Sequence, residues 1–134
     1  MYSDLYWVGN SKRELQKCPK TIKKRIGFQL LKLQNGLQPD DFKSITSVGQ
    51  GVYEIRVSDE RGNNTGRCFY VAKIKGSIYV LHVFVKKSQK TSKQNLTLGK
   101  ERFKELQAYV YNYASNTSFC DWYICGNFVV GSFC

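Results

Sequence analysis

Residues 52–57 read Val-Tyr-Glu-Ile-Arg-Val, and their side chains follow a period of two. This is the period of a β-strand, in which successive side chains point to opposite faces. Tyr53 and Ile55 then share one face, whereas Glu54 and Arg56 share the other. The stretch therefore predicts a strand with one apolar side and one charged side.

Two further strands follow at short distances along the chain. Residues 59–66 (DERGNNTG) are rich in turn-forming residues, and a strand-like composition resumes over residues 67–75. Gly76 and Ser77 make a second turn before residues 78–85, which are again rich in β-branched and aromatic residues. Three successive strands with short links predict an antiparallel meander.

Helical patterns lie on both sides of the meander. After a short strand at residues 4–8, Ser11 and Glu14 have the spacing of a capping box and predict a helix start. Pro19 interrupts this helix, and a second one follows and stops at Gly36. The apolar positions of the second helix are Ile22, Ile26, Leu30, Leu33 and Leu37. A last helix is predicted from the spacing of Leu98, Arg102, Phe103, Leu106 and Val110.

The predicted order is strand, helix, helix, strand, strand, strand, helix, which is typical of an α+β domain. We expect a small antiparallel or mixed sheet packed by helices on one face. The 21 basic residues all lie within residues 1–106, whereas residues 107–134 carry one charge and many aromatic side chains. We therefore predict a domain at residues 1–108 and an apolar aromatic extension at residues 109–134.

The composition limits the classes of function. A net charge of +11 over 134 residues favours a polyanionic partner. No stretch reaches the roughly 18 uninterrupted apolar residues that span a bilayer, so we expect no membrane partner. The first ten residues lack the basic start and apolar run of a secretory signal, which predicts a cytoplasmic protein.

The cysteines do not predict a disulfide framework, because there are five of them and they lack close, repeated spacing. Cys120, Cys125 and Cys134 could join His82 as zinc ligands, but their spacing lacks the two-residue knuckle of zinc sites. We expect free cysteines that pack as small apolar residues. The prediction is that the protein has no metal and no cofactor.

If helices cover one sheet face, the other face holds charged side chains from all three meander strands. At alternate positions these are Glu54, Arg56, Arg67, His82 and Lys86, with Lys87 and Lys90 on the loop beyond. Converging cations near aromatic rings suit single-stranded RNA, because Arg and Lys hold phosphates and aromatic side chains stack on bases. The alternative is a positive surface patch without catalysis.

Several segments resemble the RelE/HigB superfamily of bacterial toxins, specifically its phage-derived HigB-like branch. The most specific piece is Leu81-His82-x-Phe84-x-Lys86-Lys87 within residues 79–91. Weaker similarity covers residues 19–30, 33–36, 52–56 and 67–70, and the whole resemblance spans residues 5–108. Ser92 stands where this branch usually has proline, which leaves the loop conformation open.

The resemblance implies a RelE-like fold and a toxin of a type II toxin-antitoxin system. It also implies a helix-turn-helix antitoxin partner and endonucleolytic cleavage of messenger RNA, usually on the ribosome. Relatives of the ParE type act instead on a protein target such as DNA gyrase, and an inactive RNA-binding module is a third possibility. The cationic face argues for the ribonuclease.

Metal-independent RNA cleavage by the 2′-hydroxyl needs a base, an acid and positive charge at the phosphate. Arg56 and Arg67 suit the charge-stabilising role, because guanidinium binds phosphate bidentately and stays protonated. Lys86, Lys87 or Lys90 could stabilise charge or act as the acid. Glu54 is either the base or a structural partner that holds Arg56.

His82 titrates near neutral pH, but a lone histidine in a strand is more often a hydrogen-bonded core residue. The side chains predicted to bind RNA are Lys73, Lys90, Lys93, Tyr70 and His82. The aromatic extension has too much apolar surface to lie in water. We expect it to pack on its own chain or to form a homodimer, with residues 123–125 and 127–130 pairing as strands.

Overall fold

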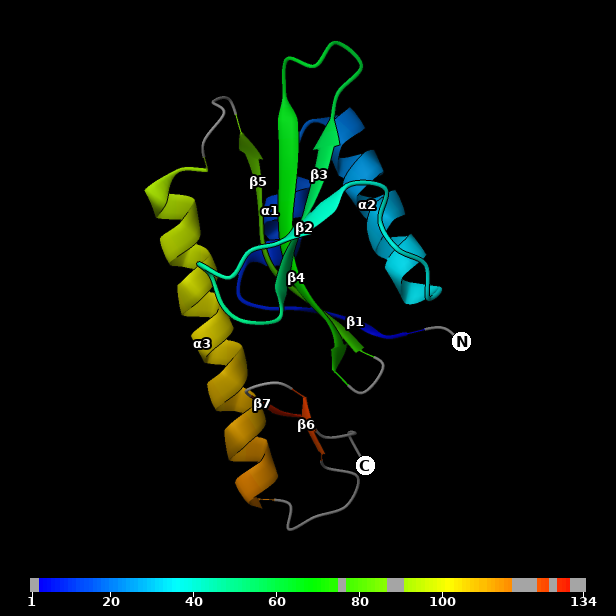
Figure 1. Ribbon diagram of the computed structural model, residues 1–134. Helices are drawn as coiled ribbons and strands as arrows, with labels where there is room; N and C mark the ends of the chain where they lie inside the picture. The colour runs from blue at the N-terminus through cyan, green and yellow to red at the C-terminus, as the bar shows by residue number, and fades with distance from the viewer. Residues whose placement is uncertain (1–2, 75–76, 87–90, 117–122, 126–127, 131–134) are drawn as a thin grey trace.

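The computed structural model describes residues 3–74, 77–86, 91–116, 123–125 and 128–130 (Figure 1). Its main sheet contains β1 (Leu5–Trp7), β2 (Phe42–Ser44), β3 (Val52–Ser58), β4 (Thr65–Ile74) and β5 (Ser77–Lys86). The helices are α1 (Ser11–Gln16), α2 (Lys20–Gln34) and α3 (Lys93–Asn116). Within the described residues, no helix is long and apolar enough to cross a membrane.

The strand order across the sheet is β1-β5-β4-β3-β2. β3, β4 and β5 form the predicted antiparallel meander, with Arg56 opposite Arg67 and Arg67 opposite Phe84. β1 adds to β5 in parallel, so the sheet is mixed. β2 pairs antiparallel with β3 and was not predicted, because its three exposed residues carry too short a pattern.

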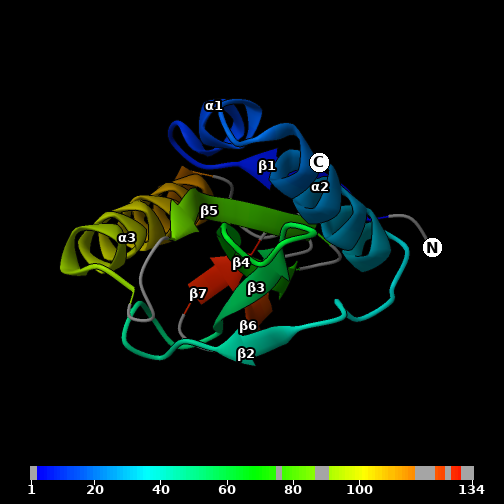
Figure 2. The ribbon, with the colours of Figure 1, turned by 90° about the horizontal axis from the view of Figure 1, so that it is seen from above.

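The helices cover both faces of the sheet, and the expectation that they share one face is wrong. Figure 2 shows α2 and α3 on opposite sides of the strands. α2 packs Ile22, Ile26 and Leu30 on the face that contains Ile55. α3 packs on the other face, through Phe103, Leu106 and Val110. The physical reason lies in strand alternation, since neighbouring apolar residues of β4 and β5 bury both sides of the sheet.

The first helix begins at Ser11 as predicted, but the capping box does not form. Asn10 is the N-cap residue, and no side chain caps this helix end. Ser11 Oγ instead donates to the Val80 carbonyl at 3.0 Å, and Glu14 turns towards β5. Tertiary partners thus replace the local hydrogen bonds that the spacing predicted.

α2 ends as the sequence predicted. Gly36 has φ of +80°, a left-handed conformation that favours glycine. The Leu37 amide donates to Lys32 O at 2.9 Å and the Gly36 amide donates to Leu33 O at 3.0 Å, which is the Schellman arrangement. After this helix end the chain turns back towards the sheet and forms β2.

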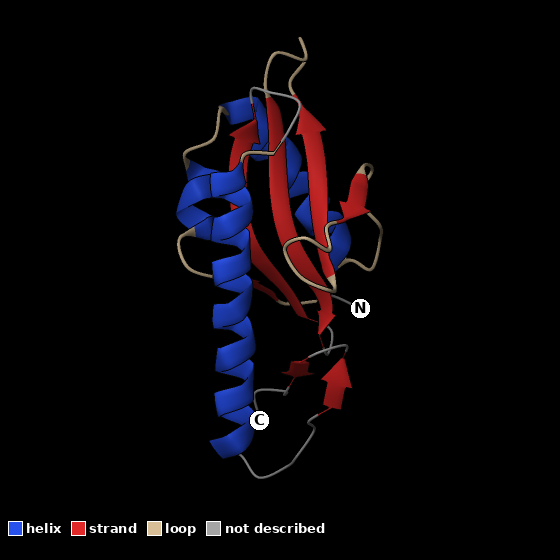
Figure 3. Cartoon of the chain, turned by 60° about the vertical axis from the view of Figure 1, so that its left-hand side comes forward, coloured by secondary structure: helices blue, strands red, loops and turns tan. Residues whose placement is uncertain are grey.

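Beyond the main sheet, β6 (Tyr123–Cys125) and β7 (Phe128–Val130) pair antiparallel, as expected from the sequence. Figure 3 shows this hairpin beside the second half of α3. α3 runs through residue 108, so the predicted boundary at 108/109 falls inside a helix.

Candidate functional site

Strand alternation gathers charged side chains at one end of the face on which α3 packs. We call this set the charged cluster; it consists of Lys43, Glu54, Arg56, Arg67 and Lys86. Lys43 lies opposite Glu54 in the β2–β3 register, and Arg56 lies opposite Arg67 in the β3–β4 register. α3 packs on the apolar part of the same face.

Glu54 and Arg67 form the buried centre of the charged cluster. The Glu54 side chain is 1% exposed, and its Oε1 lies 3.8 Å from Arg67 Nε and 4.0 Å from Lys43 Nζ. These separations bring opposite charges together without closing a hydrogen bond. Among the described residues, Glu54 Oε2 and Arg67 Nε are the buried side-chain polar atoms that have no hydrogen-bond partner.

An unsatisfied buried polar atom is costly, and in native proteins it calls for a specific explanation. A bound ligand that donates to Glu54 and accepts from Arg67 would supply the missing partners. The pair thus leaves one acceptor, Glu54 Oε2, and one donor, Arg67 Nε, without partners among the described residues.

The cations of the cluster also affect one another. Burial lowers the pKa of Arg67, partly offset by the Glu54 carboxylate, while the nearby Arg56 lowers it further. Burial also lowers the pKa of Lys86, and the Arg67 charge acts in the same direction. Lys86 is therefore a better proton donor than an isolated lysine, as the sequence chemistry anticipated.

Arg56 is held differently from the sequence-based expectation. Its Nη2 and Nε donate to Asp41 Oδ1 at 2.7 and 3.1 Å. Glu54 therefore does not hold Arg56, because Asp41 does so from the segment before β2, while Glu54 faces Arg67 and Lys43. Sequence reasoning missed Asp41 and Lys43, since only the return strand β2 places them here.

Two predicted RNA-binding side chains do not belong to the charged cluster. Tyr70 is 2% exposed and lies in the core cluster under α2, since it is three positions from Arg67 and thus on the opposite face. His82 is 4% exposed and lies at a register shift of the β4–β5 pairing. Burial therefore corrects the prediction that these two side chains contact RNA.

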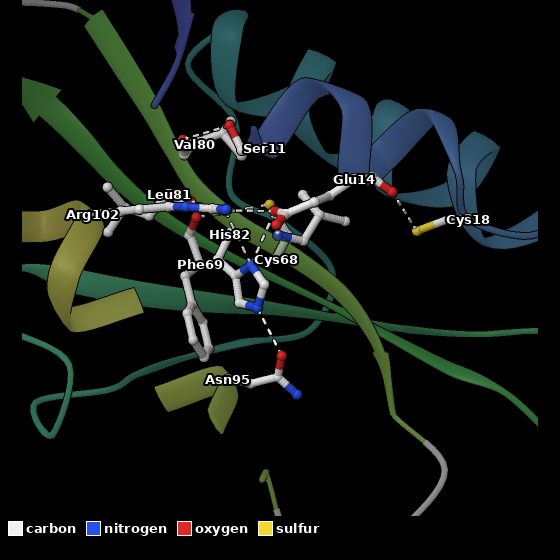
Figure 4. A network of polar contacts seen from close by, with 11 residues as sticks. Ser11, Glu14, Cys18, Cys68, Phe69, Val80, Leu81, His82, Asn95 and Arg102 are labelled. Carbon is white, nitrogen blue, oxygen red and sulfur yellow. Dashed lines mark hydrogen bonds and ion pairs between the residues drawn. The ribbon is translucent and has the colours of Figure 1, made fainter. Parts of the chain in front are cut away.

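His82 belongs to a buried polar network that joins α1, β5 and α3 (Figure 4). Its Nδ1 lies 2.9 Å from Glu14 Oε1, and its Nε2 lies 2.8 Å from Asn95 Oδ1. Arg102 Nη1 donates to Glu14 Oε1 at 2.6 Å, and the Val83 amide donates to the same oxygen at 3.1 Å. His82 is thus the hydrogen-bonded core residue that the sequence left open as an alternative.

The remaining predicted side chains are placed only in part. Lys87 and Lys90 lie outside the described residues, and so does the side chain of Lys73. Lys93 is exposed at the first residue of α3. Ser92 caps that helix, because its Oγ accepts from the Asn95 amide at 3.2 Å, while residues 87–90 of the preceding loop lie outside the described residues.

The described residues contain no group of three or more His, Cys, Asp or Glu side chains that could hold a metal ion. The candidate zinc ligands Cys120 and Cys134 lie outside the described residues, as does the side chain of Cys125. Of the described cysteines, Cys68 is free and buried, and Cys18 is free and partly buried.

The fold defines the class to which the protein belongs. A structure of a mutant of the E. coli toxin RelE in the free state aligns with a TM-score of 0.54 over 79% of this chain and 99% of that chain, at 15% identity. The chain therefore has the RelE fold.

The particular family follows from the sequence. The family model described as "Phage derived protein Gp49-like" matches residues 13–104, and the chain belongs to this family. These two findings confirm the resemblance to the phage-derived branch of the RelE/HigB superfamily. No curated protein matches the sequence.

Proposed function

We propose that the protein is the toxin of a type II toxin-antitoxin system and acts as an endoribonuclease on messenger RNA. The observation that carries this proposal is the buried Glu54–Arg67 pair, whose Oε2 and Nε atoms lack partners within the described chain. It lies among three further basic residues on the sheet of a RelE fold. Membership of a phage-derived family and the net charge of +11 support the same proposal.

The proposed reaction uses the RNA's own 2′-hydroxyl. A base takes the proton of this hydroxyl, the 2′-oxygen forms a bond to phosphorus, and the bond from phosphorus to the 5′-oxygen breaks. An acid protonates the departing 5′-oxygen, and a 2′,3′-cyclic phosphate remains. Every proton and electron pair is accounted for without a metal or cofactor.

Each side chain of the cluster has a role in this scheme. Arg67 stabilises the negative charge that develops on the phosphate, because its charged side chain lies in the cluster and keeps 13% exposure. Lys86 serves as the acid, because its pKa is lowered by burial and by Arg67. Glu54 holds Arg67 by charge from 3.8 Å, or acts as the base if bound RNA displaces the side chains that bury its Oε2.

The ribosome is the proposed setting, and a helix-turn-helix protein is the proposed antitoxin. A cluster of so few groups does not by itself order a flexible RNA, whereas the decoding site holds messenger RNA in a fixed conformation. We place the protein in the cytoplasm, where translated messages are found.

Primer extension on translated messages after induction of the protein tests this proposal. Discrete, codon-linked cuts that disappear when translation is blocked before induction are expected. DNA damage without such cuts would indicate the ParE-like alternative, a toxin acting on gyrase. Neither cuts nor damage, together with RNA binding, would indicate a non-catalytic RNA-binding module.

A further inference from the structure

Large exposed apolar side chains gather on the outer side of α2. Phe28 is 55% exposed and Leu31 is 45% exposed, and their spacing of three places them on the same side of the helix. Exposed apolar groups that cluster, rather than lie singly, mark interaction surfaces. Neither residue belongs to the charged cluster.

Phe28 and Leu31 line a cleft of about 870 Å³ between α2 and β3. Its far wall contains Arg56, Val57 and Ser58, where the paired part of β2 has ended. Arg25 bonds the Ser58 carbonyl and so ties the helix to this strand edge. Figures 1 and 2 show α2 running along that side of the sheet. We call this feature the α2 cleft.

The rim of the α2 cleft is mainly basic. Lys20 and Lys24 are exposed there. Of the two acidic residues on the rim, Asp40 is bound by Lys32 and Gln29, whereas Glu60 is exposed. An occupant with acidic side chains beside an apolar row would match this rim and these walls. A second copy of the chain fits less well, because it would bring the same lysines and a net charge of +11 to the contact.

RNA also fits the α2 cleft less well than an acidic protein segment. Leu31 offers no stacking surface to a base, and the guanidinium groups of Arg25 and Arg56 are bound to Ser58 O and Asp41. A single amphipathic helix presents apolar residues every three or four positions, and such a row can pack against Phe28 and Leu31.

We propose that the α2 cleft binds an acidic amphipathic helix of the antitoxin. This inference rests on the proposed function for the identity of the partner. Arg56 belongs both to the wall of the cleft and to the charged cluster. A helix bound here therefore lies next to the charged cluster, where it would hinder the approach of RNA.

Calorimetric titration with the helix-turn-helix protein encoded next to the chain's own gene tests the proposal. The double substitution Phe28→Asp and Leu31→Asp should weaken binding at least 100-fold while RNA cleavage is retained. Tyr109→Asp on α3, where the native residue is 53% exposed, is the matched control and should leave the Kd unchanged. Thermal melting of all variants checks that they fold.

Two charge-reversal variants, one in the cleft and one outside it, give a second readout. Lys24→Glu should weaken binding about 10-fold and reduce its salt dependence, whereas Lys12→Glu on α1 should not. The proposal would be overturned by an unchanged Kd for the antitoxin in the double variant, or by absence of binding to the native chain. It would also be overturned if the double variant lost RNA binding instead of antitoxin binding. A chain that binds the antitoxin through the cleft but cuts no RNA would overturn only the proposed ribonuclease.

Discussion

Arg67 enters the charged cluster from a strand whose neighbouring residues are buried on both faces. Its Nη1 donates to the Gly66 carbonyl at 3.1 Å, whereas Glu54 Oε1 lies 3.8 Å from Arg67 Nε, beyond hydrogen-bond distance. Such a side chain stabilises charge in a transition state without first breaking a strong bond. Burial also lowers its pKa.

We therefore expect Arg67→Ala to reduce RNA cleavage by about 100-fold or more. The change also leaves the buried Glu54 carboxylate without its nearest cation, so the melting temperature should fall as well and is measured alongside. Cleavage of a translated message, measured by primer extension at equal protein levels, checks this. Arg13→Ala, which removes an exposed arginine of α1, is the control. Full activity in the Arg67 variant would show that the site assignment is wrong.

Glu14 gives a prediction about pH rather than catalysis. Burial raises the pKa of its carboxyl, but hydrogen bonds from His82, Arg102 and the Val83 amide outweigh this and lower the pKa to about 2. Because the folded state favours the ionised carboxylate, this contribution to stability is full above the ordinary pKa of 4.5. It is lost as the pH falls from there towards 2.

Urea unfolding of Glu14→Gln should show a loss of about 3 kcal/mol at pH 7, because Arg102 is then buried without its anion. The difference from the native chain should shrink as the pH falls from about 4.5 towards 2. Asp59→Asn, on the exposed β3–β4 loop, is the control and should cost less. A difference between Glu14→Gln and the native chain that persists unchanged at pH 2 would contradict the role of the network.

At the scale of elements, the alternation over residues 52–57 and the two strand-like segments after it were sufficient to predict the meander. They also predicted four members of the charged cluster: Glu54, Arg56, Arg67 and Lys86. They misplaced His82, because the β4–β5 register shifts next to this residue, and no composition signal marks that shift. The capping box failed because Ser11 and Glu14 found partners on β5, far away in sequence. Local patterns thus predicted the elements, whereas tertiary contacts decided which side chains meet.

Gly66 shows how closely α2 and β4 approach each other. A Cβ atom at this position would lie 2.5 Å from Ile22 Cγ2 and 3.0 Å from Val57 Cγ2. Gly66→Ala should therefore destabilise the protein by about 1–3 kcal/mol. Gly27→Ala, at a helical position with open space around it, should instead stabilise it by about 0.5–1 kcal/mol. Urea unfolding measures both, and a neutral Gly66→Ala would mean that α2 lies farther from the sheet.

At the scale of the whole molecule, the basic residues and the aromatic C-terminal sequence are segregated along the chain. Residues 1–106 carry all 21 basic residues, and the sequence after α3 is apolar and aromatic. The charged cluster and the α2 cleft both belong to the first part. The hairpin of β6 and β7 lies beside the second half of α3, away from both (Figures 1 and 3). The composition shift thus separates the proposed functional surfaces from a region whose role must be tested independently.

The C-terminal hairpin supplies the last prediction. The sequence from residue 119 to 133 is too apolar to remain in water, and β7 packs along α3, so the hairpin covers part of that helix. A chain that ends at Asn116 should lose solubility or change its oligomeric state in light scattering, yet still cut RNA, because the charged cluster lies before α3. Removing only residues 132–134 is the control. If the shortened chain kept its oligomeric state, solubility and melting temperature, the hairpin would contribute nothing to the fold; if a native dimer became a soluble monomer, the hairpin would be its interface.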